Sequence, residues 1–272
     1  MSTRKLLCQM PLKKDPQDPK TQLVYDMIRK DLDLVKRPET EVVIQSPEHG
    51  LTTVAEYASN GLRFLNDRDV LQSVLDAVER EGFDGVIIAC FFDPALGAAK
   101  GLLDIPVVGL AEPSMHFAAS MGLKFAVITS NSGFIPGMTE NIHQYGMEAQ
   151  ALETNPVRSI AISEQDFHGG FAGDYGPVVD SFTATAQGCI EDGAEVLIAG
   201  CGIMSPMLTL AGVTDIQGVP IIDPELIALK MAESMVDLDQ AGIPYISRKG
   251  IYAHLPRNTG SRFSSKALAD SQ

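Results

Sequence analysis

The sequence predicts an α/β protein built from two similar halves, each with a parallel β-sheet. Apolar runs of strand length alternate with longer segments of helical periodicity, which is typical of α/β folds. One pattern also occurs twice, as DGVIIAC at 84–90 and EVLIAGC at 195–201. Gly82 and Gly193 stand at the same offset before these copies, and IPVV at 105–108 matches VPII at 219–222 downstream. The halves are therefore expected to share the same wiring.

In the first half we expect strands at residues 5–9, 41–45, 85–89 and 106–110. The run at 85–89 is nearly continuous in apolar residues, as a parallel strand covered on both faces requires. Helical periodicity covers residues 18–34, 54–65 and 69–80. In the first of these helices Leu23, Met27, Ile28 and Leu34 are expected on one apolar face.

In the second half we expect strands at 125–129, 196–199 and 220–222, followed by a helix over 225–238 that packs back on the first half. The chain is divided near 112–113 and 223–224, so residues 1–113 plus 223–272 form the first domain and 114–222 the second. No Gly/Ser-rich linker separates them, so they are expected to be packed together. The basic tail beyond Ser247 is either solvated or packed on the acidic body or a second subunit.

Composition excludes several classes of function. The 272 residues carry a formal net charge of −14, which disfavours a binder of nucleic acid or of anionic membranes. No apolar run reaches the ~18 residues of a membrane span. The N-terminus enters a predicted strand without a secretory signal, so we expect a cytoplasmic protein whose four cysteines are reduced.

The repeated cysteines, Cys90 and Cys201, are the candidate catalytic residues. Each follows a strand, and each is followed closely by a helix-start signal, Asp93-Pro94 or Ser205-Pro206. Free amides and a helix dipole there are expected to lower the pKa of a thiol and to stabilise a developing enolate. Two thiols at matching places, one in each half, suggest a cleft with one proton-transfer group on either side.

The alternatives for these cysteines are a small buried hydrophobic residue or a structural disulfide. Cys189 lies in a helical stretch and is expected in the core, and Cys8 ends the first strand without a repeat partner, so it is assigned a structural role. No metal site is expected, because the histidines lack ligand spacing: His49, His116, His143, His168 and His254.

Motifs for other chemistries are missing from the sequence. There is no P-loop, no Gly-x-Ser-x-Gly elbow and no complete dinucleotide fingerprint around Gly200-Cys201-Gly202. The glycine-rich segment 169–173 is interpreted as an ordinary loop, with a mobile lid as the alternative.

The chain resembles the aspartate/glutamate/hydantoin racemase superfamily, and within it the hydantoin racemases most closely. The matching segments are IACFFDPAL at 88–96, IPVVGLAE at 105–112, FAVIT at 125–129, AGCGIM at 199–204 and VPIIDP at 219–224. The resemblance implies two flavodoxin-like domains related by a pseudo-twofold, with the active site in the cleft between them. It implies racemisation without a cofactor, with Cys90 and Cys201 as the acid–base pair, and a homo-oligomer.

By this resemblance the candidate substrate-binding residues are Gln9, at the end of the first strand, and five residues of the matching segments: Phe91, Phe92, Thr129, Gly202 and Ile203. The family's first strand usually leads into an Asn-Pro-Asn type segment, where this chain has Gln9-Met10-Pro11. The superfamily's amino-acid racemases tend to carry a hydroxyl residue close after each cysteine. Phe91-Phe92 and Gly202-Ile203 stand there instead, which suits an uncharged ring or a large apolar substituent.

The predicted function is a cofactor-independent racemase acting on a small molecule at a carbon next to a carbonyl, with 5-substituted hydantoins as the expected substrates. Backbone amides near Phe91 and Gly202 are expected to stabilise the enolate. The alternatives are an isomerase, a decarboxylase or an amino-acid racemase of the same superfamily. An alternative of another class is a non-catalytic two-domain ligand-binding protein.

Overall fold

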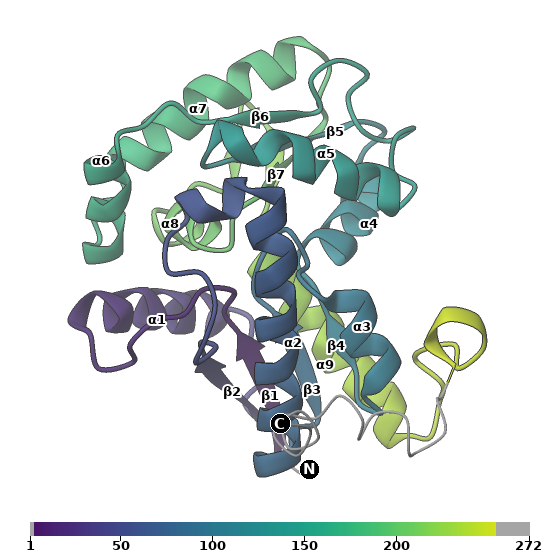
Figure 1. Cartoon of the computed structure of the whole chain (residues 1–272). Helices are drawn as coiled ribbons and strands as arrows, with labels where there is room; N and C mark the ends of the chain where they lie inside the picture. The colour runs from purple at the N-terminus through teal and green to yellow at the C-terminus, as the bar shows by residue number, and fades with distance from the viewer. Residues whose placement is uncertain (1–2, 254–272) are drawn as a thin grey trace.

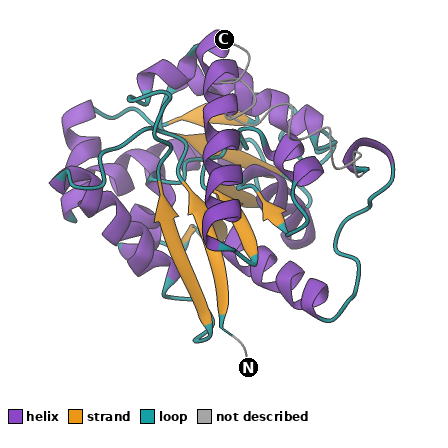
Figure 2. Cartoon of the chain, turned by 60° about the horizontal axis from the view of Figure 1, so that its bottom comes forward, coloured by secondary structure: helices purple, strands orange, loops and turns teal. Residues whose placement is uncertain are grey.

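The computed structural model describes residues 3–253, whose strands form two mainly parallel sheets with helices on both sides (Figures 1 and 2). The first sheet has the order β2-β1-β3-β4. Its strands are β1 (Arg4–Gln9), β2 (Thr40–Gln45), β3 (Gly85–Ile88) and β4 (Val107–Val108). The second sheet has the order β6-β5-β7-β9-β8. Its strands are β5 (Phe125–Thr129), β6 (Val157–Ser159), β7 (Val196–Ala199), β8 (Asp215–Ile216) and β9 (Val219–Ile222).

The predicted repeat is confirmed by the topology. The second sheet repeats the order of the first: β6 corresponds to β2, β5 to β1, β7 to β3 and β9 to β4. The paired strands are parallel in both sheets, and only the short edge strand β8 runs antiparallel. β3 and β7 are thus equivalent central strands, and every residue of both is buried. This explains why the two cysteine patterns look alike.

The helices connect and cover these strands. The long and medium helices are α1 (Pro19–Leu32), α2 (Asn60–Glu81), α4 (Ala111–Met121), α5 (Ile135–Gln144), α7 (Gly176–Glu191) and α9 (Pro224–Gln240). The short ones are α3 (Leu96–Leu102), α6 (Glu164–Gly169) and α8 (Met204–Leu210), with 3₁₀ turns η1 (Ala55–Ala58), η2 (Ser132–Phe134), η3 (Gly170–Ala172) and η4 (Gly250–Tyr252).

One apolar core is continuous across the two halves. It joins Ile28 of α1 and Leu229 of α9, under the first sheet, to Met115 of α4 and Ile142 of α5, under the second. Separate clusters fill the outer faces, under α2 and α3 in one half and under α7 and α8 in the other. The halves are therefore packed together, as the lack of a linker predicted.

Two details of the predicted helices are wrong. Residues 54–65 and 69–80 do not form two helices: a 3₁₀ turn, η1, is followed by one long helix, α2. α1 ends at Leu32, so Leu34 lies beyond it, and both Leu23 and Leu34 are exposed. Met27 and Ile28 are buried as predicted, together with Tyr25 and Leu32. The prediction of this face was based on its aliphatic residues, whereas a tyrosine and a threonine form part of the buried face of α1.

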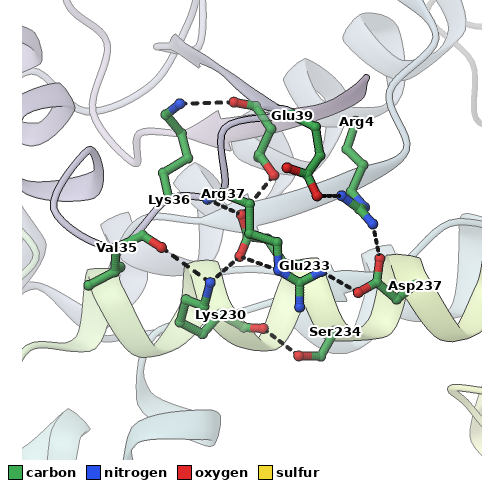
Figure 3. A network of polar contacts seen from close by, with 10 residues as sticks. Arg4, Val35, Lys36, Arg37, Glu39, Lys230, Glu233, Ser234 and Asp237 are labelled. Carbon is green, nitrogen blue, oxygen red and sulfur yellow. Dashed lines mark hydrogen bonds and ion pairs between the residues drawn. The ribbon is translucent and has the colours of Figure 1, made fainter. Parts of the chain in front are cut away.

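The final helix, α9, returns to the first half as predicted, and a polar network holds it there (Figure 3). Arg4 of β1 forms ion pairs with Glu39 and with Asp237 of α9. Glu233 of α9 is fully buried and accepts hydrogen bonds from the Thr40 hydroxyl (2.7 Å) and the Arg37 amide (2.9 Å). Burial opposes ionisation of Glu233, but the bonds from Lys230, Arg37 and Thr40 outweigh it and lower its pKa.

We expect Glu233→Ala to destabilise the protein by about 3 kcal/mol, because it leaves buried donors without an acceptor. Since the folded pKa is depressed, this contribution is present above the ordinary glutamate pKa and is lost as pH falls through the folded value. Urea unfolding at pH 7 and pH 4 measures it. Ser234→Ala, which removes an exposed hydroxyl on the same helix, is the control and should change stability by less than about 0.5 kcal/mol. An equal, small effect of both substitutions would contradict the structural role of the network.

We propose the same division into domains as the sequence suggested, because it follows the two sheets. Residues 1–113 and 223–272 form the first domain, and residues 114–222 form the second. The first part of the basic tail packs on the first half, where Arg248 donates to the carbonyl oxygens of Lys100 (2.7 Å) and Leu103 (2.5 Å). The rest of the tail, from 254 on, lies outside the described residues. Among residues 3–253, no helix is long and apolar enough to cross a membrane.

Candidate active site

Both repeated cysteines open onto one cavity of about 470 Å³, to which the two halves contribute walls. Cys90 comes two residues after β3, and Cys201 two residues after β7. Because the carboxyl ends of parallel strands are where open α/β sheets bind ligands, this is the expected place for a site. The thiols are also close enough for the charge of Cys201 to influence Cys90. Both cysteines are free and partly exposed, so the disulfide alternative is wrong for this structure.

The Cys90 thiol has an apolar surrounding with a few polar partners. The backbone amide of Phe92 is near enough to favour its thiolate, and the Tyr57 side chain lines the same cavity. Burial raises the pKa of Cys90, while the Phe92 amide lowers it less, and the negative charge of Asp93 raises it further. The predicted lowering of the Cys90 pKa is therefore wrong, because burial away from water outweighs the nearby amide.

The Cys201 thiol has a different partner. The hydroxyl of Ser130, which directly follows β5, donates to the Cys201 sulfur at 3.5 Å. Ser130 and Cys201 therefore meet across neighbouring strands of the second sheet, since β5 pairs with β7. The Cys201 thiol thus has a hydroxyl partner from a distant part of the chain.

The helix starts after the cysteines differ from those predicted. Asp93 does not cap α3; its carboxylate accepts from the amides of Leu110 (2.6 Å), Ala111 (3.0 Å) and Glu112 (2.9 Å) and so caps α4. Ser205 lies inside the first turn of α8, which begins at Met204. The sequence predicted that each residue would cap the helix directly after it. Asp93 instead caps α4, which begins beyond the next strand, β4.

Of the predicted substrate-binding residues, Phe91, Phe92, Gly202 and Ile203 line the cavity. Phe91 contributes little side-chain surface, since it is 1% exposed. Gly202 has no room for a side chain, because an added Cβ would lie 2.6 Å from Glu225 Oε1. Within residues 3–253 the amides of Phe91 and Gly202 have no hydrogen-bond partner.

Gln9 and Thr129 do not line the cavity, contrary to the prediction. Both are fully buried. Gln9 Oε1 accepts from Gln45 Nε2 (2.7 Å) and Ser73 Oγ (2.9 Å), so its side chain points toward α2. Side chains point to alternate faces along a strand. The residue after Gln9, Met10, therefore lines the cavity, and the residue after Thr129, Ser130, contacts Cys201.

Sequence reasoning missed most of the cavity wall. Tyr57, Phe134 and Met138 supply aromatic and apolar surface next to Phe92. The Tyr57 and Phe92 rings stack at 5.5 Å, and the Phe134 ring packs edge-on against Phe92 at 5.3 Å. No motif marks these residues, because Tyr57 comes from η1, Phe134 from η2 and Met138 from α5, and only the tertiary fold brings these elements together.

The glycine-rich segment at 169–173 forms the end of α6 and the turn η3, which contacts α1 of the other half. Phe171 of this segment and His168 just before it line the cavity, and so do Thr21 and Val24 of α1. The segment is therefore a wall of the cavity. The charged residues that line the cavity are exposed to solvent: Lys14, Asp18 and Lys20.

The other two cysteines stay in the core, as predicted. Cys8 and Cys189 are both fully buried, and neither lines the cavity. Burial raises the pKa of Cys189 to about 11. No cluster of three or more His, Cys, Asp or Glu side chains within residues 3–253 has the geometry of a metal site.

Known proteins with similar sequences and structures fit this arrangement. The Asp/Glu/Hydantoin racemase family model matches residues 21–232. A hydantoin racemase of Pseudomonas sp. (strain NS671) is 29% identical over 203 residues, which cover 74% of this chain and 76% of that protein. A hydantoin racemase of Paenarthrobacter aurescens is 32% identical over 165 residues, 60% of this chain and 66% of that protein.

Among solved structures, allantoin racemase from Klebsiella pneumoniae superposes with a TM-score of 0.75 at 25% identity, covering 94% of this chain and 95% of that one. Glutamate racemase from Francisella tularensis shares the fold at 16% identity and a TM-score of 0.57, covering 91% and 86%. The predicted family and the two-domain α/β fold are thereby confirmed. The chain belongs to the Asp/Glu/hydantoin racemase family and is, as a member, a racemase and so an isomerase.

Proposed function

We propose that this racemase interconverts the enantiomers of 5-substituted hydantoins, with Cys90 and Cys201 as its acid–base pair. The observation that supports it most is the single cavity onto which both thiols open, at equivalent strand ends of the two halves. A proton removed from one face of a planar centre and returned to the other needs two groups in this arrangement. Sequence similarity to two hydantoin racemases supports the substrate class.

In the proposed mechanism, the thiolate of one cysteine takes the proton from C5 of the ring. The C–H electron pair moves into an enolate whose negative charge rests on the C4 oxygen. The other cysteine, as thiol, gives its proton to the opposite face of C5 and becomes the thiolate. Amides of Phe91 and Gly202 bind the enolate oxygen, which supplies charge stabilisation beyond the acid–base assistance.

The cavity lining supports a neutral ring with an apolar substituent. Its inner wall is made of aromatic and aliphatic side chains, among them Leu12, Val24, Phe92 and Phe134. A zwitterionic amino acid would need charged partners once it leaves water, and the charged lining residues are exposed ones. This favours hydantoins over free amino acids.

Allantoin is the second candidate, because an allantoin racemase shares the fold at 25% identity. Allantoin is itself a hydantoin, with a polar ureido group at C5, so the same two thiols would serve it. The apolar wall of the cavity favours a benzyl or isobutyl group at C5 over the ureido group of allantoin.

Loss of optical rotation by pure enantiomers tests the proposal. We expect rotation to decay with 5-benzyl- and 5-isobutylhydantoin, more slowly with allantoin, and not with glutamate or aspartate, after subtraction of spontaneous racemisation. Iodoacetamide is expected to stop the decay. Racemisation of an amino acid with no effect on any hydantoin would contradict the proposed substrate class.

We also propose a cytoplasmic location and a homo-oligomer. The location is supported by the requirement for reduced thiols, since all four cysteines are free.

A further inference from the structure

Two hydroxyl groups share one hydrogen bond on the wall of the cavity. The Tyr25 phenol oxygen and Ser46 Oγ lie 2.6 Å apart, and both residues line the cavity. Tyr25 comes from α1 and is 3% exposed, and Ser46, which directly follows β2, is half-buried. Within residues 3–253 neither hydroxyl has another hydrogen-bond partner. The pair is therefore a polar point in a mostly apolar wall.

The pair has hydrogen-bonding capacity left for a ligand. Each hydroxyl carries one proton and two lone pairs, and burial raises the pKa of the Tyr25 phenol, so it keeps its proton at neutral pH. The shared bond uses the proton of one hydroxyl and a lone pair of the other. The accepting hydroxyl keeps its own proton, and the donating hydroxyl keeps its lone pairs. Whichever hydroxyl donates inside the pair, one donor and one acceptor remain side by side.

The amide edge of a ring is complementary to this pair. In a cyclic amide the N–H and the C=O lie on the same side, and the bond lengths place the nitrogen and the oxygen about 2.2 Å apart. The N–H can donate to one hydroxyl, that hydroxyl to the second, and the second to the C=O. All three hydrogen bonds then run in one direction, and bonds in such a chain strengthen one another.

We propose that Tyr25 and Ser46 form a recognition site for the amide edge of a cyclic ureide, the edge that N3–H and the C2 carbonyl form in a hydantoin. The inference rests on the proposed function in that it takes a hydantoin as the substrate, and it adds which edge of the ring is bound and by which residues. A free amino acid has no such edge, so the pair selects the ring.

The position of the pair fits the edge of the ring that lies opposite C5. Ser46 follows β2, and β1 separates β2 from β3, the strand that leads to Cys90. Neighbouring strands are about 4.8 Å apart, so Ser46 lies about 10 Å across the sheet from the strand of Cys90. In a hydantoin the bond opposite C5 is N3–C2. A ring with C5 between the thiols therefore directs its N3–C2 edge toward β2.

The other hydroxyls that line the cavity do not offer the same pairing. The Thr21 hydroxyl donates to the carboxylate of Asp18 at 3.3 Å. The Tyr57 phenol accepts from Asn66 Nδ2 at 3.0 Å. Tyr57 is a single hydroxyl, and one hydroxyl cannot lie in line with both the N–H and the C=O of an amide edge. Among the described lining residues, Tyr25 and Ser46 are thus the two hydroxyls joined to each other.

Binding of three small rings tests the inference. Hydantoin has the complete edge, 1-methylhydantoin keeps it, and 3-methylhydantoin lacks the N3–H. None has a substituent at C5, so each measures recognition of the ring apart from racemisation. Isothermal titration calorimetry of the wild type should give a Kd about tenfold higher for 3-methylhydantoin than for 1-methylhydantoin, because the methyl group at N3 leaves the hydroxyl pair without its partner.

Substitutions in the pair should reduce both affinity and discrimination. Tyr25→Phe and Ser46→Ala should each raise the Kd of hydantoin about three- to tenfold, the worth of one neutral hydrogen bond. In the double variant the two methylated rings should bind equally, because no hydroxyl is left to distinguish them. The KM for 5-benzylhydantoin should rise in Tyr25→Phe with little change in kcat, since the ring edge is bound equally in the ground state and the transition state.

Tyr57→Phe is the matched control, because it is the same substitution at another phenol of the cavity. The ratio of the Kd values for 3-methyl- and 1-methylhydantoin is the readout, and it should stay as in the wild type. The wild-type ratio itself needs no substitution, so the test holds even for a variant that folds poorly.

Equal Kd values for the two methylated rings in the wild type, or no binding of any of the three rings, overturns the inference. So does a ratio that persists in the double variant or disappears in Tyr57→Phe. The proposed function then still stands if 5-benzylhydantoin is racemised. If the wild type discriminates the rings through Tyr25 and Ser46 but racemises no hydantoin, the proposed function fails and the recognition site remains.

Discussion

Replacing either Cys90 or Cys201 by alanine is expected to stop racemisation in both directions. A proton must leave one face of C5 and return on the other, and each variant lacks the group on one face. Acid–base assistance is worth about 10² to 10⁴ in rate, so kcat/KM should fall by about that factor. Because the equilibrium constant between enantiomers is one, the loss in kcat/KM must be equal for both substrates. Polarimetry with each pure enantiomer measures it.

Cys189→Ala is the matched control for these variants. Cys189 is fully buried in α7, away from the cavity, so its replacement should cost about 1 kcal/mol of stability and leave kcat as in the wild type. Near-normal racemisation by Cys90→Ala or Cys201→Ala would contradict the two-thiol mechanism.

Asp31→Asn is expected to stabilise the protein at neutral and alkaline pH. Asp31 of α1 is fully buried, and neither of its carboxylate oxygens has a hydrogen-bond partner within the described chain. Burial, and then the charges of Asp223 and Glu225, raise its pKa to about 9. The folded protein therefore holds a proton that the unfolded chain releases above about pH 4.

Stability from this group is fully present below the unfolded pKa and is lost as pH rises toward the folded value near 9. Asparagine mimics the protonated form without that loss. We expect a gain on the order of 2–4 kcal/mol at pH 8 and almost none at pH 4, from urea unfolding at both values. Asp33→Asn, at an exposed carboxylate just after the same helix, should change stability by less than about 0.5 kcal/mol. Destabilisation by Asp31→Asn at pH 8 would show that the carboxylate is ionised and needed.

The positions of Cys90 and Cys201 could be predicted because they depend on a repeat. The two sheets have the same strand order, so the carboxyl ends of equivalent strands lie at equivalent places. The repeated sequence pattern identifies these equivalent strands. The same holds for most strands, whose apolar runs are continuous, and for the return of α9.

The partners of the thiols could not be predicted. Ser130 reaches Cys201 from the residue after β5, and Tyr57 lines the cavity beside Cys90 from η1. No spacing in the sequence relates either residue to its cysteine. The error at Gln9 and Thr129 has another cause. Each is one residue from a site-facing position, and a one-residue shift in a strand reverses the face. The pKa of Cys90 depends on how fully its surroundings exclude water, which only the packed structure defines.

Deuterium exchange by the single-cysteine variants tests the two-thiol assignment most directly. In D₂O, the thiolate that remains in each variant can remove the C5 proton of the enantiomer facing it and return deuterium to the same face. Proton NMR of each pure enantiomer should then show loss of the C5–H signal without loss of optical rotation. Cys90→Ala and Cys201→Ala should do this for opposite enantiomers. Exchange of the same enantiomer by both variants, or exchange accompanied by racemisation, would contradict the assignment of one thiol to each face.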